Sequence, residues 1–202
     1  MDKKILDHFK KHDLILYAYA IKVGKLEVLK KEKSTKYFYR LCREIICQQL
    51  SDKAGAAIFT RFMKLFPASE VSVHLILKTP HEILRSTGMS NAKGKYLRNL
   101  ADHIDKGLLD PSELDKMNDK DVIQTLIKVK GIGPWTAEMF LMFTLCRPDV
   151  FSFGDLGLKK AIIKLYGFKK EPKRSTIEKI VNKWSPYKTF AARILWTSLD
   201  NP

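Results

Sequence analysis

Residues 129–137, VKGIGPWTA, place two glycines and a proline between two apolar runs. Gly131 and Gly133 permit positive φ and leave room for a ligand to approach the backbone. Pro134 suits the first position of a helix, where its missing N–H costs nothing. The pattern predicts a tight turn between two helices, and the free amides of such a turn can bind a phosphate. Taken alone, the same pattern is equally typical of a turn that only connects two helices and binds no ligand.

Both sides of this turn carry helical signals. Residues 119–128 have apolar side chains at helical spacing, and residues 134–146 are apolar nearly all round, which indicates burial. Residues 37–50 show a similar one-sided apolar face. No alternating stretch competes convincingly, although residues 71–77 could form a short strand. We therefore predict an all-α chain of about ten short helices without a β domain.

Helix starts and chain breaks are also marked. Capping motifs with Glu at the third helical position occur at residues 79–82, 110–113 and 175–178. Candidate breaks fall at residues 24–34, 88–94, 147–154 and 167–174. None of the breaks is long enough for a free linker, so two lobes sharing an interface are the expected organisation.

The charge of the chain is strongly positive. The 202 residues include 37 Lys and Arg and 22 Asp and Glu, which gives a net charge of +15 spread over the whole length. This excess favours a polyanionic partner such as nucleic acid, although an ordinary basic protein would also fit. No signal peptide and no apolar run of membrane-spanning length is apparent, so a cytosolic chain without a membrane partner is expected.

The cysteines indicate free thiols. Cys42, Cys47 and Cys146 are an odd number and lie in apolar helical contexts, which favours buried thiols over a disulfide framework. Three thiolates also cannot supply the four ligands of an ordinary iron–sulfur cluster.

Three segments together resemble a known family. The segment LIKVKGIGPWTAEMFLMF resembles the helix-hairpin-helix of the HhH-GPD DNA glycosylase superfamily, and VFSFGDLGLKKAI resembles its Gly/Pro-rich loop ending in a catalytic aspartate. The segment IICQQLSDKAGAAI is similar to the helix-turn-helix of the AlkA-like 3-methyladenine glycosylase branch. The resemblance runs from Tyr37 to Trp196.

This resemblance implies a fold and a domain organisation. The chain 1–202 would be a single all-α glycosylase unit with two lobes and a cleft between them. Lobe one would span about 35–149 and include the helix-hairpin-helix at 119–146, and lobe two would combine about 1–34 with 150–202.

Asp155 is the one acid in the apolar nonapeptide 150–158. Asp in this position commonly caps a helix. The resemblance adds the role of catalytic carboxylate, because cleavage of an N-glycosidic bond builds positive charge on the sugar. The same carboxylate could orient or deprotonate the attacking water. The two roles are compatible.

Trp135 separates two subclasses of the family. Relatives that also cut the DNA strand carry a nucleophilic lysine at this position, which forms a Schiff base with the sugar. Lys130 is out of register with that position. The resemblance therefore implies a monofunctional glycosylase in which water is the acceptor and an abasic site is the product.

The resemblance also implies a base pocket and a wedge. Trp135, Trp196, Met139 and Leu156 would line the pocket, where an indole can stack on an extruded base and attract it if it is cationic. Trp196 has an alternative as a core aromatic, and Trp184 is expected in the core. In the segment STGMSNAKGKYLRNLA, Asn91 stands where an AlkA-like enzyme carries an apolar intercalator, so Met89 could share the wedge function.

The remaining site residues are carried by the hairpin. Gly131, Gly133 and Thr136 would offer donors to a phosphate. By resemblance alone, the main-chain carbonyls of Ile127, Val129 and Ile132 would hold a structural Na⁺ or K⁺. His8 and His12 are four residues apart but lack a third ligand, so surface positions are expected for them.

The resulting prediction is a DNA glycosylase that excises alkylated purines, 3-methyladenine foremost, from damaged double-stranded DNA in base excision repair. It would act as a monomer without a required cofactor, in the nucleoid of a prokaryote or the nucleus of a eukaryote. Two alternatives stay open. One is a glycosylase for hypoxanthine, ethenoadenine or an oxidised purine, and the other is a DNA-binding module without catalysis.

Overall fold

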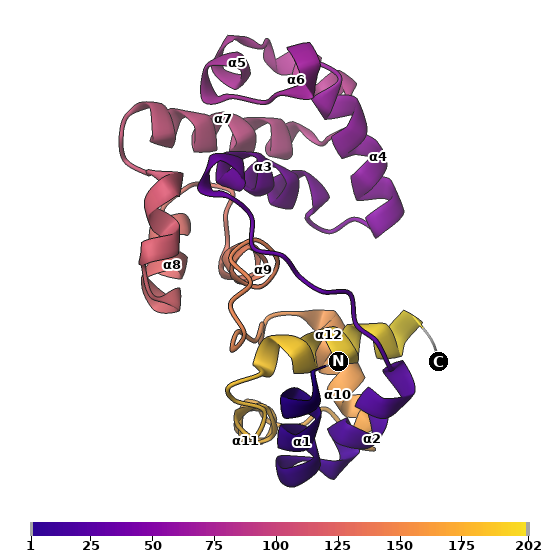
Figure 1. Ribbon diagram of the computed structural model, residues 1–202. Coiled ribbons are helices and arrows are strands. Elements are labelled where there is room, and N and C mark those ends of the chain that lie inside the picture. The colour runs from indigo at the N-terminus through magenta and orange to yellow at the C-terminus, as the bar shows by residue number, and fades with distance from the viewer. Residues whose placement is uncertain (1, 201–202) are drawn as a thin grey trace. The chain divides into compact units, whose positions relative to one another are not determined.

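The structure is a computed structural model that describes residues 2–200, so the first and the last two positions of the predicted unit lie outside the described residues. Within that part the chain forms α-helices and short 3₁₀ helices and no strand (Figure 1). The all-α prediction is confirmed. The α-helices are α1 (Lys3–His12), α2 (Leu14–Val23), α3 (Tyr37–Cys47), α4 (Asp52–Met63), α5 (Val73–Lys78), α6 (His81–Ser86), α7 (Asn91–Asp105), α8 (Asp119–Leu126), α9 (Pro134–Phe143), α10 (Leu156–Leu165), α11 (Arg174–Asn182) and α12 (Lys188–Asp200). The 3₁₀ helices are η1 (Ser34–Lys36), η2 (Pro67–Ser69) and η3 (Pro111–Lys116).

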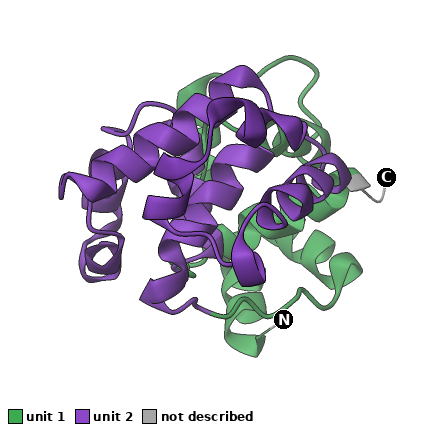
Figure 2. Cartoon of the chain, turned by 90° about the horizontal axis from the view of Figure 1, so that it is seen from above, with its two compact units in different colours: residues 1–30, 146–202 green, residues 31–145 purple. Residues whose placement is uncertain are grey.

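The chain divides into two compact units (Figure 2). Unit 1 consists of Met1–Lys30 and Cys146–Pro202, and unit 2 consists of Lys31–Leu145. Unit 2 thus contains α3 to α9, and unit 1 contains α1, α2 and α10 to α12.

Unit 2 is organised around α3. This helix packs against α4, α7 and α9, and α5 packs on α7 (Figure 1). The buried face of α3 carries Leu41, Ile45 and Ile46. The ring of Tyr37 meets that of Phe140 edge-on, with 5.6 Å between centroids. Burial of this apolar face, rather than helix propensity alone, stabilises helices of such modest length.

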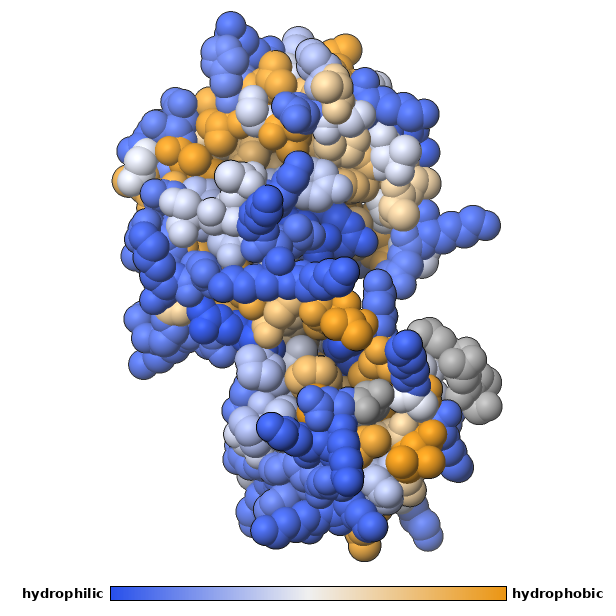
Figure 3. Space-filling view, in the orientation of Figure 1, coloured by the Kyte–Doolittle hydropathy of each residue, from blue (hydrophilic) through white to orange (hydrophobic). Residues whose placement is uncertain are grey.

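Unit 1 is held together by the packing of α1 on α2, of α2 on α12 and of α10 on α12. At its centre, the buried carboxylate of Asp13 accepts hydrogen bonds from Tyr166 Oη at 2.5 Å and from Trp184 Nε1 at 2.9 Å. The Trp184 indole is completely buried, which confirms its predicted core position. In the view of Figure 3, hydrophilic side chains cover α1 and α11, whereas apolar ones gather over α2, where Leu14 and Ile21 are exposed.

Three local predictions need correction. The possible strand at 71–77 is wrong, because Ser72 accepts from the Leu75 amide at 3.3 Å and starts α5. Thr79 does not cap α6, because its hydroxyl donates back to the Leu75 carbonyl. Ser175 lies inside α11, which starts one residue earlier. By contrast, Asp110 does cap its helix, through the Ser112 amide at 2.8 Å, although that helix is of the 3₁₀ type.

The thiols and the remaining features agree with the sequence in part. Among the described residues, none of Cys42, Cys47 and Cys146 forms a disulfide, and only Cys42 is buried. Burial raises the pKa of the Cys42 thiol far above its usual range. None of the helices in the described part is long and apolar enough to cross a membrane.

Candidate active site

The predicted hairpin forms between α8 and α9 in unit 2. Asn118 starts α8 by accepting a hydrogen bond from the Asp121 amide at 2.9 Å, and Pro134 occupies the first turn of α9. The Ile132 amide donates to the Val129 carbonyl at 3.0 Å and closes the turn. Among the residues described, the amides of Gly131 and Gly133 donate to no other group. The hairpin therefore presents unpaired donors next to a helix N-terminus, as a phosphate site requires.

Glycine is needed at positions 131 and 133 for different structural reasons. Gly131 adopts a φ of +111°, and a Cβ built on it would lie 2.1 Å from Cγ of Tyr96. Gly133 has a φ of −95°, and a Cβ there would have nothing within 4 Å. Gly131 is thus required by the fold itself, whereas Gly133 leaves an open surface for an approaching ligand.

Side chains from distant parts of unit 2 support the hairpin. Gln48 Nε2 donates to the Gly131 carbonyl at 3.0 Å and to Thr136 Oγ1 at 2.9 Å. Asn99 Nδ2 donates to the Lys130 carbonyl at 3.1 Å. Thr136 is 2% exposed, so its hydroxyl supports the hairpin and is not open to a ligand. Sequence reasoning missed Gln48 because its partners lie 83 and 88 positions away.

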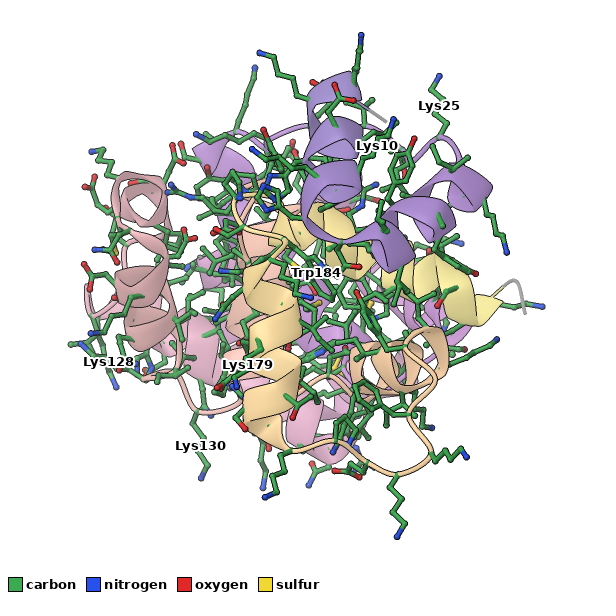
Figure 4. The ribbon with its side chains drawn as sticks, turned by 90° about the horizontal axis from the view of Figure 1, so that it is seen from below. Lys10, Lys25, Lys128, Lys130, Lys179 and Trp184 are labelled. Carbon is green, nitrogen blue, oxygen red and sulfur yellow. The ribbon has the colours of Figure 1, made fainter. Side chains whose placement is uncertain are left out.

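A polar hollow adjoins the hairpin within unit 2. It encloses about 440 Å³ and is lined by residues of α7 together with Lys130. Lys95 and Arg98 add positive charge to its wall, while Arg98 itself donates to the Thr79 carbonyl at 2.5 Å. Lys128 and Lys130 extend outward from the hairpin (Figure 4). The surroundings of the turn are therefore favourable for an anion.

Two predicted pocket residues lie at the start of α9. Trp135 is half-buried in its first turn, and Met139, one turn further on, is 4% exposed. Both belong to unit 2, together with the hairpin that precedes them.

Asp155 lies in unit 1 and starts α10. Its Oδ1 accepts a hydrogen bond from the Leu158 amide at 2.7 Å, so the expected cap is present. The same oxygen accepts from Trp196 Nε1 at 3.2 Å. A Cβ on Gly157 would lie 3.0 Å from this oxygen and 3.4 Å from Cδ1 of Trp196, which leaves little room beside the pair. The structure thus brings Asp155 and Trp196 together, and Leu156 beside them is 71% exposed.

Aromatic rings build the loop that carries Asp155. Phe151 lies edge-on to Phe153 at 5.0 Å and to the buried Trp184 at 5.7 Å. The guanidinium of Arg174 sits 3.9 Å from the centroid of the Phe153 ring. The loop is therefore fixed to the core of unit 1 on one side and covered by a cation on the other.

The wedge segment places its two candidates differently. Asn91 is exposed at the first position of α7, and its Oδ1 accepts a hydrogen bond from His81 Nε2 at 2.6 Å. The His81 ring packs where a Cβ on Gly94 would come within 2.8 Å. Met89 is 4% exposed and forms part of the core, so its side chain is not available to enter DNA. His81 is a partner that the sequence did not indicate.

Carbonyl oxygens of the hairpin have the chemistry that a monovalent cation needs. Of the three predicted ligands Ile127, Val129 and Ile132, the Val129 oxygen already accepts the Ile132 amide and retains a second lone pair. No group of three or more His, Cys, Asp or Glu in the described chain could hold a metal ion. His8 instead bonds the Lys183 carbonyl at 3.0 Å and stacks on His12.

Comparisons with known proteins agree with this arrangement. The sequence profile of the family described as "HhH-GPD superfamily base excision DNA repair protein" matches residues 42–186. The DNA-3-methyladenine glycosylase 1 of Schizosaccharomyces pombe is 33% identical over 165 residues, which cover 79% of this chain and 71% of the yeast protein. YfjP of Bacillus subtilis is 33% identical over 162 residues, covering 77% of this chain but 56% of that protein, so the chain spans little more than half of its length.

A solved structure extends the likeness to the fold. The Schizosaccharomyces pombe 3-methyladenine DNA glycosylase in complex with abasic DNA superposes with a TM-score of 0.89 at 28% identity, over 98% of this chain and 97% of the other. The family profile covers well over half of the chain, and its residues include the hairpin and the Asp155 loop. The chain therefore belongs to the HhH-GPD superfamily of base excision DNA repair proteins, in its 3-methyladenine DNA glycosylase branch.

Proposed function

We propose that this chain is a monofunctional DNA glycosylase that removes alkylated purines, 3-methyladenine foremost, from duplex DNA by hydrolysis of the N-glycosidic bond in base excision repair. The observation that carries the proposal is the Asp155 carboxylate, held by the Leu158 amide and the Trp196 indole within a chain of this family. The names of the relatives favour alkylated purines over other lesions.

Asp155 is the catalytic carboxylate in this proposal. Departure of the base leaves positive charge on the deoxyribose, and a carboxylate about 4 Å away stabilises that charge by roughly 4 kcal/mol at an effective dielectric of 20. The two hydrogen bonds to Oδ1 fix the orientation of the group before the substrate arrives. The carboxylate also orients the water that attacks the sugar and takes its proton.

Trp135 makes the reaction hydrolytic. The position after the hairpin holds an indole, which has no nucleophilic nitrogen for a Schiff base. The product is then a free base and an abasic site in an uncut strand.

The proposal assigns contact with the extruded base to Trp135 and Met139 of unit 2 and to Leu156 and Trp196 of unit 1. An alkylated purine such as 3-methyladenine is cationic, and the face of an indole attracts a cation by about 0.5–2 kcal/mol. A cationic base is also a good leaving group, so a strong general acid is not needed.

The hairpin grips the DNA strand through the amides of Gly131, Gly133 and Thr136. Asn91, at the start of α7 and in the wall of the hollow beside the hairpin, enters the stack and bonds the base left without a partner. Because the Asn91 oxygen accepts from His81, the amide nitrogen of Asn91 is the group that would donate to that base.

The carbonyls of Ile127, Val129 and Ile132 would hold a Na⁺ or K⁺ that stiffens the turn. In our proposal the protein works on damaged double-stranded DNA as a monomer of a single glycosylase unit, wherever the cell keeps its DNA, and requires no cofactor for the chemistry.

The test is incubation with duplexes that each carry one lesion, followed by alkali cleavage at abasic sites. Duplexes with 3-methyladenine, hypoxanthine, ethenoadenine and an oxidised purine form the panel, and an undamaged duplex is the control. We expect the alkylated purine to be released fastest. If no duplex yields an alkali-labile site, the proposed function is wrong and the chain is a DNA-binding module.

A further inference from the structure

Basic residues occur along the whole chain, but the net positive charge differs strongly between segments. Residues 156–188 of unit 1 contain ten Lys and Arg against two Glu, a net charge of +8. Residues 119–146, which form the hairpin and its two helices, contain three Lys against three acids and are neutral. More than half of the total charge of +15 thus lies in 33 residues that the family hairpin does not include.

Most of this charge is exposed and unpaired. Both glutamates of the segment are engaged, Glu171 by Lys159 and Glu178 by Arg174. The Lys188 ammonium lies 3.4 Å from Asp149. Seven further lysines point to solvent without a carboxylate partner within the described chain, namely Lys160, Lys164, Lys169, Lys170, Lys173, Lys179 and Lys183. Lys160 and Lys164 come from α10, Lys179 from α11 (Figure 4), and Lys183 directly follows α11. Lys169, Lys170 and Lys173 come from the loop 166–173, and we call the whole set the α10–α11 basic surface.

The basic surface is fixed to the loop that carries Asp155. Arg174, at the start of α11, covers the face of Phe153 at 3.9 Å, and Phe153 is two residues before Asp155. At the start of the loop 166–173, Tyr166 donates its hydroxyl hydrogen to the buried Asp13 at 2.5 Å. The lysines between these anchors are therefore presented by an attached segment of unit 1, next to the loop of the reactive carboxylate.

We propose that the α10–α11 basic surface binds backbone phosphates of the duplex that flanks the nucleotide at Asp155. Duplex DNA carries one negative charge about every 1.7 Å of its axis, so a surface with seven unpaired ammonium groups suits it. The segment 119–146 has no net charge and contributes directed amides beside the cations of α7, and the α10–α11 basic surface contributes most of the salt-dependent affinity. The inference rests on the proposed function in one respect, namely that the DNA bound by this surface is the same duplex that supplies the nucleotide to Asp155.

The test is a charge-reversal variant in the loop, Lys169→Glu with Lys170→Glu and Lys173→Glu. The matched control is Lys3→Glu with Lys11→Glu and Lys22→Glu, which makes the same charge change on exposed residues of α1 and α2 in the same unit. Binding to an undamaged duplex is measured by fluorescence anisotropy at salt concentrations between about 50 and 200 mM. Over roughly this range, the loss of phosphate contacts changes the affinity strongly. Circular dichroism and the melting temperature establish that both variants are folded.

We expect the loop variant to bind at least about tenfold more weakly, and the slope of log affinity against log salt to fall by about 2–3, since each phosphate contact contributes roughly 0.9. The control should change affinity by less than about threefold and leave the slope within about one unit. Equal affinities and slopes for the two variants would overturn the inference.

Base release from a 3-methyladenine duplex, measured in parallel, separates this inference from the proposed function. If the native chain releases no base but the loop variant still loses its salt dependence, the basic surface stands and the proposed function falls. If base release is intact and the loop variant binds like the control, the proposed function stands and the basic surface is not a DNA contact.

Discussion

Replacement of Gly131 by alanine should destabilise unit 2 through two separable effects. The backbone at this position has a φ of +111°, a region that residues with a Cβ rarely adopt. The new Cβ would also lie 2.1 Å from Cγ of Tyr96, far inside van der Waals contact. Gly131→Ala must therefore shift either the turn or the Tyr96 ring.

The expected magnitude follows from these two effects. An L residue forced into an unfavourable φ/ψ region costs about 1–3 kcal/mol. Overpacking against a neighbour typically costs about 1–3 kcal/mol more. The sum is about 2–6 kcal/mol, which for a chain of this size lowers the melting temperature by roughly 4–24 °C.

Two glycines of the same chain serve as matched controls. Gly107 has a φ of +68° with nothing within 4 Å of a Cβ, so Gly107→Ala carries the backbone cost without a clash. Gly133→Ala carries neither cost, since φ is −95° and the surrounding space is open. Urea unfolding should rank the variants with Gly131→Ala as the least stable and Gly133→Ala close to the native chain.

Tyr96→Ala in the Gly131→Ala background isolates the clash by a double-mutant cycle. Relief of the clash should make the double variant more stable than the sum of the two single changes predicts. If Gly131→Ala unfolds at the same urea concentration as Gly107→Ala, the packing of Tyr96 on the turn does not constrain the hairpin.

Three further outcomes are expected. Asp13→Ala should cost about 2–5 kcal/mol in urea unfolding, because it leaves the Tyr166 hydroxyl and the Trp184 N–H without their buried acceptor; an unchanged midpoint would contradict this. Burial raises the pKa of Glu44, so the protonated carboxyl favours the folded state below about pH 4 and this contribution is lost as the pH rises. Glu44→Gln should therefore have a higher melting temperature than the native chain at pH 7 but not at pH 4. A difference in melting temperature that is the same at both pH values would refute this. Trp135→Lys supplies the missing amine, so borohydride should trap a covalent complex with lesion DNA, whereas none should form with the native chain.

The hairpin and the cap of α10 could be predicted from the sequence because they depend on neighbouring residues. Two glycines followed by a proline determine the turn, and Asp155 reaches the Leu158 amide three residues on. The unsuccessful capping assignments show the limit of such patterns. Thr79 and Ser175 match the motif, but packing sets the helix starts elsewhere.

The partners of the site could not be predicted because they are far apart in the chain. Gln48 meets the hairpin from 83 residues away, and Trp196 meets Asp155 across 41 residues. Met89 and Asn91 are two residues apart in the wedge segment, yet one is buried and the other exposed. Only tertiary packing makes that distinction.

The most direct measurement is the single-turnover rate of base release from a 3-methyladenine duplex by the native chain and by Asp155→Asn. Asparagine keeps a side-chain oxygen for the Leu158 amide and removes the negative charge. Loss of roughly 4 kcal/mol of electrostatic stabilisation should slow release by about 10³-fold or more, while DNA affinity stays within about tenfold. Release by Asp155→Asn at the native rate would contradict the assignment of Asp155 as the catalytic carboxylate.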